Sequence, residues 1–284
     1  MIKKPQKFVL RIVTGLLLGS LFIFSVFENK LIFYTMVIFF QIISIWELKK
    51  MFPNSIDTFF WLFLVIWMDS IILLDLHSYN LISNLSYFNK SILVPFSSIS
   101  IVILLIFILK NILNSKNIVN DIVFKNTITE FFLFFYFIVS LSLSFVLFEI
   151  KKGLFFLLVV VTNYSHDIFA YFSGKIFGKT PFFNNISPSK TLEGYIGGSL
   201  LSFLIGLFIA EKLQLFELGM VKIVVIIFLI SFFCAFGDLF ESLAKRVANV
   251  KESGSIILGH GGVLDRLDSL IFSIFISSSI YFLI

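Results

Sequence analysis

The chain has 284 residues, of which 58% are hydrophobic and 14% are charged, and its mean hydropathy is +1.03. This composition excludes a soluble globular domain and indicates a polytopic membrane protein. The formal net charge of +5 is therefore interpreted by its position relative to a membrane, and no nucleic-acid partner is expected. The single cysteine, Cys234, excludes both an intramolecular disulfide and a cysteine metal cluster.

Apolar segments of about 16 to 22 residues recur along the chain, and each can cross a bilayer core of roughly 30 Å as a helix. The first follows Lys3, Lys4 and Lys7 but lacks a convincing signal-peptide cleavage site, so we interpret it as an uncleaved span. We predict an all-α, polytopic integral membrane protein with about nine transmembrane helices. The predicted spans are 8–27, 31–48, 59–76, 92–109, 130–148, 153–172, 195–210, 220–236 and 268–284.

The positive charges predict how these spans are oriented. With the N-terminus in the cytoplasm, 16 of the 22 Lys and Arg residues fall on the cytoplasmic side. The six exceptions are Lys30, Lys90, Lys151, Lys152, Lys212 and Lys222. We expect a protein of a bacterial-type cytoplasmic (inner) membrane, with about five N-terminal helices in residues 1–152 and a C-terminal region in residues 153–284. Two polar loops of that region would face the cytoplasm.

A few ionisable residues fall inside or beside the predicted spans. Arg11 and Glu47 lie near cytoplasmic ends, where long side chains can reach the surface, and Asp69 and Asp75 are expected near the outer face. Asp167 lies near the end of an otherwise apolar span, a position that predicts contact with a polar cavity or a partner.

The first polar loop, about 173–194, combines hydroxyl, cationic and glycine residues. Ser187, Lys190 and Thr191 can donate hydrogen bonds to phosphate oxygens. Three glycines open the next span, and we expect them to allow close helix packing rather than ligand contact. They are Gly194, Gly197 and Gly198.

The second polar segment, 237–268, contains three aspartates suited to metal binding. Asp265 and Asp268 are three residues apart and would lie on one side of a helix, while Asp238 begins the segment. Mg²⁺ takes such carboxylate oxygens as ligands. A salt-bridged helix end is the commoner explanation of an aspartate pair at this spacing, so the neighbouring residues decide between the two interpretations.

Cationic and hydroxyl residues occupy the two turns after Asp238. In a helix, Asp238, Ser242 and Lys245 share one face, and Arg246 lies beside them. The hydroxyl group can bond a phosphate oxygen, and the cations can neutralise a polyphosphate. This neighbourhood favours a phosphate-binding metal site.

A glycine-rich stretch, Gly259 to Gly262, surrounds His260. Glycines allow the backbone to approach a phosphate closely or to form a tight turn before a helix, and the sequence favours neither interpretation. His260 is equally compatible with a local backbone hydrogen bond and with a role in catalysis.

Taken together, these residues resemble the signature of the phosphatidate cytidylyltransferase family, also called CDP-diacylglycerol synthase. The C-terminal motif matches at Ser242, Lys245, Arg246, Lys251, His260, Gly261, Gly262, Asp265, Arg266 and Asp268. A second block matches at Ala170, Tyr171, Phe172, Gly174, Phe177, Gly178, Lys179, Ser187, Pro188, Lys190, Thr191, Glu193 and Gly194. The chain departs from the family pattern at Ala244, Glu252 and Leu258.

The resemblance implies that the protein condenses CTP with phosphatidate to give CDP-diacylglycerol and pyrophosphate. It also implies Mg²⁺, a second, monovalent cation, a homodimer and a surrounding lipid bilayer. Metal ligands would be Asp238, Asp265 and Asp268, and the catalytic residues would further include Lys245, Arg246 and Arg266. Substrate-binding residues would be Ser187, Lys190, Thr191, Glu193, Ser242, His260, Gly261 and Gly262.

Two alternatives remain open at this point. A transporter or channel also uses carboxylates within the membrane and glycine-interrupted helices, although no inverted repeat is visible here. A CTP-dependent enzyme that acts on another lipid phosphate would keep the same chemistry and change only the acceptor.

Overall fold

The computed structural model describes residues 20, 22–52, 62, 65, 66, 69, 72, 136–182, 190–254, 256 and 261–283. Regular structure in these ranges is helical, apart from isolated bridge residues at Gly261 and in the antiparallel pair Pro181 and Thr191. The predicted all-α class is therefore confirmed for these ranges. Arg11, Asp75 and the predicted span 92–109 lie outside them, so the count of nine helices remains a prediction.

The helices follow the predicted order of spans. The α-helices are α2 (Lys30–Met51), α7 (Leu154–Phe177), α8 (Leu192–Lys212), α9 (Met220–Val247) and α10 (Leu264–Leu283). Residues 22–28 and 136–149 are helical as well. Two 3₁₀ helices, η1 (Ile150–Gly153) and η2 (Leu215–Leu218), precede α7 and α9. The predicted division of the chain at residue 152 falls within η1.

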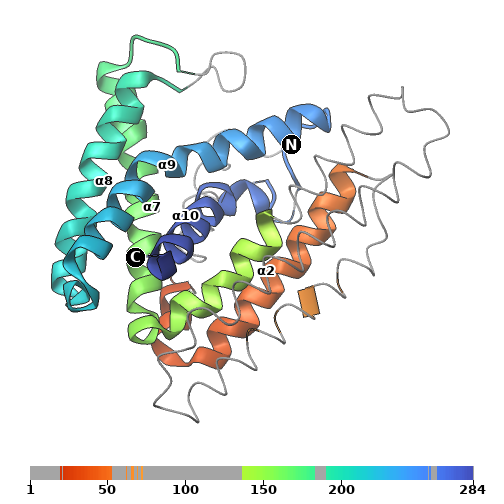
Figure 1. Ribbon diagram of the computed structural model, residues 1–284. Helices are drawn as coiled ribbons and strands as arrows, with labels where there is room; N and C mark the ends of the chain where they lie inside the picture. The colour runs from red at the N-terminus through yellow and green to blue at the C-terminus, as the bar shows by residue number, and fades with distance from the viewer. Residues whose placement is uncertain are drawn as a thin grey trace.

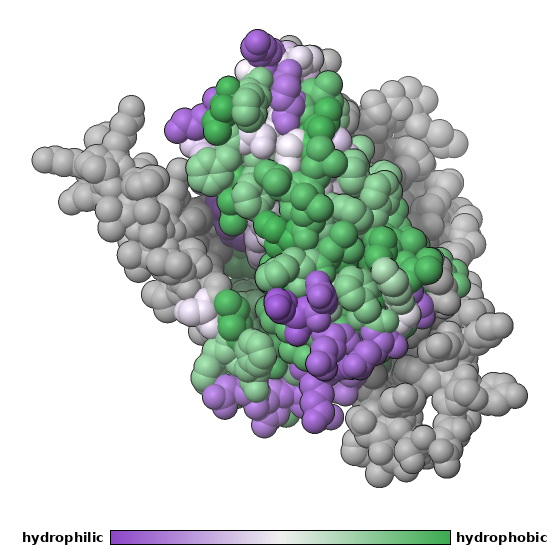
Figure 2. All heavy atoms as spheres, turned by 90° about the vertical axis from the view of Figure 1, so that its left-hand side faces the viewer, coloured by the Kyte–Doolittle hydropathy of each residue, from purple (hydrophilic) through white to green (hydrophobic). Residues whose placement is uncertain are grey.

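Three of these helices, α2, α8 and α9, are long and apolar enough to cross a membrane. One face of α8 exposes apolar side chains about one turn apart, namely Ile196, Leu200, Leu204 and Phe208. From this side, a broad apolar belt separates hydrophilic groups at two opposite ends of the molecule (Figure 2). An exposed apolar surface of this extent is typical of contact with lipid, so the chain is a membrane protein.

Helices α7 and α8 pack closely side by side (Figure 1). A Cβ atom on Gly198 would lie 2.8 Å from Cβ of Ala170, and one on Gly194 would lie 2.8 Å from the Ala170 carbonyl oxygen. A Cβ atom on Gly197 would likewise meet the side chain of Ser173. The prediction that these three glycines serve helix packing is therefore confirmed.

Helix α10 lies at the centre of the described structure, between α9 and the helix 136–149 (Figure 1). The ring of Tyr136 lies 6.1 Å from the rings of both Phe240 in α9 and Phe272 in α10, measured between centroids. Helix α10 also packs against α7. Its first turns therefore meet residues from both halves of the chain.

Helix α9 extends well beyond the predicted span, which ended at residue 236, and reaches Val247. Buried Leu239 and Ala244 continue its inner apolar face past that point, so the helix does not stop where the continuous apolar run stops. The polar residues between positions 238 and 246 consequently lie on a helix rather than in a loop.

Asp69 links segments of the N-terminal half. The residue is 4% exposed, and its Oδ1 accepts hydrogen bonds from Ser142 Oγ at 2.6 Å and from Gln41 Nε2 at 3.3 Å. A buried carboxylate needs such donors because it has lost its contact with water. Asp69 therefore joins α2 to the helix 136–149 within the protein interior.

Candidate active site

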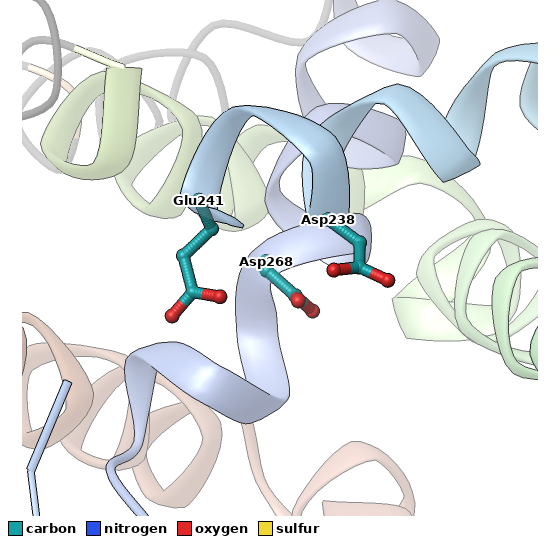
Figure 3. A group of neighbouring side chains, drawn as sticks. All are labelled: Asp238, Glu241 and Asp268. Carbon is teal, nitrogen blue, oxygen red and sulfur yellow. The ribbon is translucent and has the colours of Figure 1, made fainter. Parts of the chain in front are cut away.

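A cluster of three carboxylates forms where α9 and α10 cross. Asp238 and Glu241 lie about one turn apart on α9, and Asp268 lies in the second turn of α10. Each contributes an oxygen atom, and these atoms lie within 4.8 Å of one another. The three side chains project from the crossing into the same space (Figure 3).

Gly237 permits the close crossing that brings the carboxylates together. A Cβ atom at this position would lie 2.9 Å from Cα of Ser269 in α10. A larger residue would therefore contact the backbone of the neighbouring helix and not a movable side chain. The absence of a side chain at Gly237 thus determines how near Asp238 lies to Asp268.

Glu241 is the most buried member of the cluster, with 3% of its surface exposed. Lys245 Nζ lies 2.5 Å from Glu241 Oε2 and supplies one positive charge. Three carboxylates at this separation repel one another unless a cation or a proton binds among them. An all-oxygen set of ligands suits Mg²⁺, so the residues present fit the predicted metal.

Asp265, the third predicted metal ligand, makes other contacts. Its Oδ1 accepts a hydrogen bond from Lys245 Nζ at 2.8 Å. Its Oδ2 accepts hydrogen bonds from the backbone N–H groups of Gly262 at 2.8 Å and Ser253 at 3.1 Å. Asp265 therefore holds Lys245 and the turn before α10, and its direct binding of a metal ion remains a prediction.

Glu241 was not singled out from the sequence, although the structure groups it with Asp238 and Asp268. The available signal was its position three residues after Asp238, on the same helical face. Because an i,i+4 pair with Lys245 is an ordinary feature of exposed helices, that signal was weak. Its burial at the crossing of α9 and α10 is what distinguishes Glu241.

The other predicted catalytic residues surround the cluster. Ser242 Oγ donates a hydrogen bond to Asp238 Oδ1 at 3.3 Å. Lys245 contacts both Glu241 and Asp265 and so connects the cluster to the start of α10. Arg246 and Arg266 are exposed.

A cavity of about 510 Å³ opens between α7, α8 and α9. Lys190 lines this cavity, and its Nζ lies 2.5 Å from Oδ2 of Asp238. Asp238 therefore belongs both to the cavity and to the carboxylate cluster. The full lining consists of His166, Asp167, Ala170, Tyr171, Gly174, Lys175, Phe182, Lys190, Thr191, Gly194, Tyr195, Ala235, Asp238 and Leu239.

Thr191 and Glu193 shape the loop that carries Lys190. Thr191 is the N-cap of α8, and its Oγ1 accepts a hydrogen bond from the Gly194 N–H at 3.2 Å. Glu193 accepts hydrogen bonds from the backbone N–H groups of Lys179 and Thr180, each at 3.1 Å. In the described structure, both side chains therefore accept hydrogen bonds from backbone N–H groups and stabilise the local backbone.

Asp167 lines a cavity and has a polar partner in α10, in line with the prediction that it contacts a polar cavity or a partner. It lines the cavity described above and accepts a hydrogen bond from Ser269 Oγ at 3.3 Å. Asn163 Nδ2 donates to the same Ser269 hydroxyl at 3.0 Å, and Ser273 Oγ donates to Asn163 Oδ1 at 2.7 Å. These hydrogen bonds therefore join α7 to the part of α10 that directly follows Asp268.

Gly261 and Gly262, the described part of the glycine-rich stretch, lie directly before α10. Gly261 has a φ angle of +89°, which favours glycine over other residues. A Cβ atom on Gly262 would lie 2.5 Å from Glu47 Oε2. Both positions therefore favour glycine because of backbone conformation or close contacts, which supports the turn interpretation, whereas contact with a phosphate remains a prediction. His260 and Ser187 lie outside the described residues.

The expectation that Glu47 reaches the membrane surface is wrong. Its surface is 0% exposed. Glu47 Oε1 accepts a hydrogen bond from the Val263 N–H at 2.9 Å, and Oε2 accepts one from the Leu264 N–H at 3.0 Å. The first N–H groups of a helix have no partner within that helix, so this carboxylate takes the place of water at the start of α10.

Comparison with known proteins identifies the family. A family model described as the cytidylyltransferase family matches residues 9–284. The phosphatidate cytidylyltransferase of Bacillus subtilis (strain 168) is 32% identical over 281 residues, which cover 96% of this chain and 96% of that protein.

Two other relatives match a shorter part of the chain at higher identity. The phosphatidate cytidylyltransferase of Helicobacter pylori (strain J99) is 47% identical over 116 residues, which cover 41% of this chain and 42% of that protein. The Thermotoga maritima protein of the same name is 40% identical over 120 residues, which cover 41% of this chain and 44% of its own. These two matches thus span less than half of each relative. With the family model matching almost from end to end, the chain belongs to the cytidylyltransferase family.

Proposed function

We propose that the protein transfers CMP from CTP to phosphatidate and so forms CDP-diacylglycerol and pyrophosphate in phospholipid biosynthesis. The observation that carries this proposal is the similarity to the Bacillus subtilis phosphatidate cytidylyltransferase over 96% of both chains. The cluster of carboxylates and lysines at the α9–α10 crossing supports it, because such a cluster suits a reaction between phosphates.

The chemistry needs charge neutralisation more than proton transfer. An oxygen of the phosphatidate phosphate attacks the α-phosphorus of CTP, a P–O bond forms, and the bond to pyrophosphate breaks. A phosphate monoester is already an anionic nucleophile, so no strong general base is required. The protein must instead overcome the repulsion between two anions and align them.

Asp238, Glu241 and Asp268 are the residues that would hold Mg²⁺ in this proposal. Their oxygens are close together, and Glu241 is buried, which favours binding of a cation. When bound, the ion would neutralise charge on the reacting phosphates. Asp265 would contribute by orienting Lys245. A second, monovalent cation is also part of the proposal, and its support is the family resemblance alone.

Cationic side chains on both sides of the cluster would hold the substrates. Lys245, Arg246 and Arg266 would bind the phosphates of CTP and the departing pyrophosphate. Lys190 lines the cavity and contacts Asp238 of the cluster, so a phosphate that reaches the cluster from the cavity would meet its ammonium group. Ser187, His260, Gly261 and Gly262 are proposed to contact substrate on the basis of the motif.

We place the protein in a bacterial inner membrane, with about nine helices and the active site facing the cytoplasm. The support is that 16 of the 22 Lys and Arg residues fall on the cytoplasmic side in this arrangement. CTP is present in the cytoplasm, and phosphatidate would enter from the inner leaflet with its acyl chains in lipid. A homodimer is proposed from the family resemblance.

Pyrophosphate release by the purified protein in detergent tests the proposal. Release that requires CTP, phosphatidate and Mg²⁺ together, and that fails with ATP, is the expected result. Release with a different lipid phosphate and none with phosphatidate would assign another acceptor. No release with any lipid, from protein shown to be folded, would contradict the enzyme class and favour a transporter.

A further inference from the structure

Glu47 accepts hydrogen bonds from both ends of the segment that leads into α10, at Ser253 and at Val263 and Leu264. Besides the N–H groups of Val263 and Leu264, its carboxylate accepts a hydrogen bond from Ser253 Oγ at 3.2 Å. One buried carboxylate on α2 therefore bonds the residue where the loop begins and the residues where it ends. More than two hundred positions separate these partners in the sequence.

Two glycines leave room for this carboxylate. A Cβ atom on Gly254 would collide with Glu47 Oε1, and one on Gly262 would lie 2.5 Å from Oε2. The backbone at Gly254 and at Gly262 therefore lies tightly against the Glu47 carboxylate. Because a helix N-terminus carries a partial positive charge, the start of α10 also stabilises the negative charge of Glu47.

A continuous set of contacts leads from Glu47 to the carboxylate cluster. Asp265 accepts hydrogen bonds from the N–H groups of Ser253 and Gly262, which belong to the same loop. Lys245 then contacts Asp265 at 2.8 Å and Glu241 at 2.5 Å. Asp268 lies on α10 one turn after Asp265, so its position depends on where the helix begins.

We propose that Glu47 is a positioning residue, which fixes the first turn of α10 and thereby holds Asp268 against Asp238. This inference rests on the function proposed above and adds a residue from the N-terminal half to the site. Glu47 itself acts through the backbone of α10 and through Asp265. Its loss would loosen the cluster without removing any of its carboxylates.

Glu47→Gln is the informative variant, because it keeps the size of the side chain but leaves one oxygen for three donors. Glu149→Gln is a matched control. Glu149 accepts a hydrogen bond from Tyr34 Oη at 2.5 Å and so joins two helices near the opposite end of α2. Three quantities are compared: the Mg²⁺ concentration for half-maximal pyrophosphate release, Mn²⁺ affinity by electron paramagnetic resonance, and hydrogen exchange of the Val263 and Leu264 amides.

We expect Glu47→Gln to weaken both metal responses by about 10- to 100-fold, the usual effect of removing a residue that orients metal ligands. The two amides should exchange faster, and Glu149→Gln should leave all three quantities unchanged. Glu47→Gln protein with wild-type Mn²⁺ affinity would overturn the proposal, even if its stability or yield fell.

A second variant covers the case in which Glu47→Gln does not fold. Ser253→Ala removes one donor and should weaken Mn²⁺ binding in the same direction, whereas unchanged binding would overturn the proposal. Mn²⁺ affinity also separates this proposal from the function. Wild-type protein that binds Mn²⁺ but releases no pyrophosphate would contradict the proposed reaction, and the Glu47 comparison would still decide the positioning role.

Discussion

Gly237 in α9 packs directly against Asp268 in α10, since a Cβ atom on Gly237 would lie 2.5 Å from the Asp268 carbonyl oxygen. That oxygen belongs to the helix backbone and cannot rotate away as a side chain could. A side chain at position 237 must therefore displace α10, together with the carboxylate that Asp268 carries. The geometry of the cluster depends on this contact between two helix backbones.

Gly237→Ala should accordingly weaken the metal site. We expect pyrophosphate release to fall by at least about 10-fold and the half-saturating Mg²⁺ concentration to rise, because Asp238 and Asp268 move apart. Overpacking of this kind costs about 1–3 kcal/mol, so the thermal midpoint should fall as well. Mg²⁺ titrations of activity and a thermal melt in detergent measure the two effects.

Gly206→Ala is the matched control for this substitution. A Cβ atom on Gly206 would lie 2.5 Å from Ile227 Cγ2, so the residue is equally crowded, but its neighbour is a side chain away from the cluster. This variant should lose stability and keep the wild-type Mg²⁺ dependence. If both variants shifted the Mg²⁺ dependence alike, crowding in general would be the cause and the role of Gly237 would be refuted.

Glu241→Gln and Asp265→Asn should have different effects on the metal response. Loss of Glu241 removes an oxygen ligand, so we expect a fall in kcat of about 100-fold or more, together with a higher half-saturating Mg²⁺ concentration. Asp265→Asn weakens one of the two carboxylate contacts of Lys245 and loosens the segment before α10, so kcat should fall more than Mg²⁺ affinity. Steady-state kinetics across a Mg²⁺ series, with Asp238→Asn as a reference, separate the two.

The outcome also decides between the ligand sets drawn from sequence and from structure. A strong Mg²⁺ shift in Asp265→Asn and none in Glu241→Gln would favour the aspartates predicted from the sequence. The reverse pattern would favour the cluster of Asp238, Glu241 and Asp268 that the structure brings together.

Local patterns were sufficient for the apolar helices in the described ranges and for the packing glycines. Each of these depends on residues within a few helical turns: a run long enough to cross a bilayer, or a small residue at a helix start. The structure accordingly has helices at the predicted places in the parts of the chain that it describes, and Gly194 and Gly198 pack against α7.

The roles of Glu47 and Glu241 could not be read from local patterns. Glu47 ends an apolar run beside Lys49 and Lys50, which is typical of a surface residue, but it is buried and bonded to Ser253, Val263 and Leu264. Glu241 forms an ordinary i,i+4 pair with Lys245, but it is buried and lies close to Asp268 of α10. In both cases the deciding neighbour is distant in the sequence, so a single sequence without aligned relatives does not reveal it.

Substitutions of Thr191 test whether its hydroxyl group stabilises the start of α8 or binds substrate. Thr191→Ala removes the N-cap hydrogen bond to the Gly194 N–H and should cost about 1 kcal/mol of stability. Thr191→Ser keeps the cap and should retain both stability and activity. Thermal melts and kcat/KM for the two variants check this. Full stability with lost activity in Thr191→Ala would indicate that the hydroxyl group binds substrate instead.

Lys190 and Lys175 both line the cavity. Of these two lysines, Lys190 is the one with a described contact to the carboxylate cluster, a 2.5 Å ion pair with Asp238. Lys175 is exposed, and its Nζ lies 5.9 Å from the centroid of the Tyr171 ring. Removing the charge of Lys190 leaves Asp238 uncompensated beside two further carboxylates and takes away a phosphate-binding group. We therefore expect Lys190→Met to lower kcat/KM by at least about 10-fold.

Lys175→Met is the matched control, because it removes the same charge from the same cavity. Lys175 is exposed, and its described contact is with the Tyr171 ring and not with a carboxylate, so its effect should stay below about 3-fold. Separate KM values for CTP and phosphatidate show which substrate Lys190 serves, since only that KM should rise. Equal losses in the two variants would mean that the cavity attracts anions by its overall charge, and that the Lys190–Asp238 pair has no specific part in the reaction.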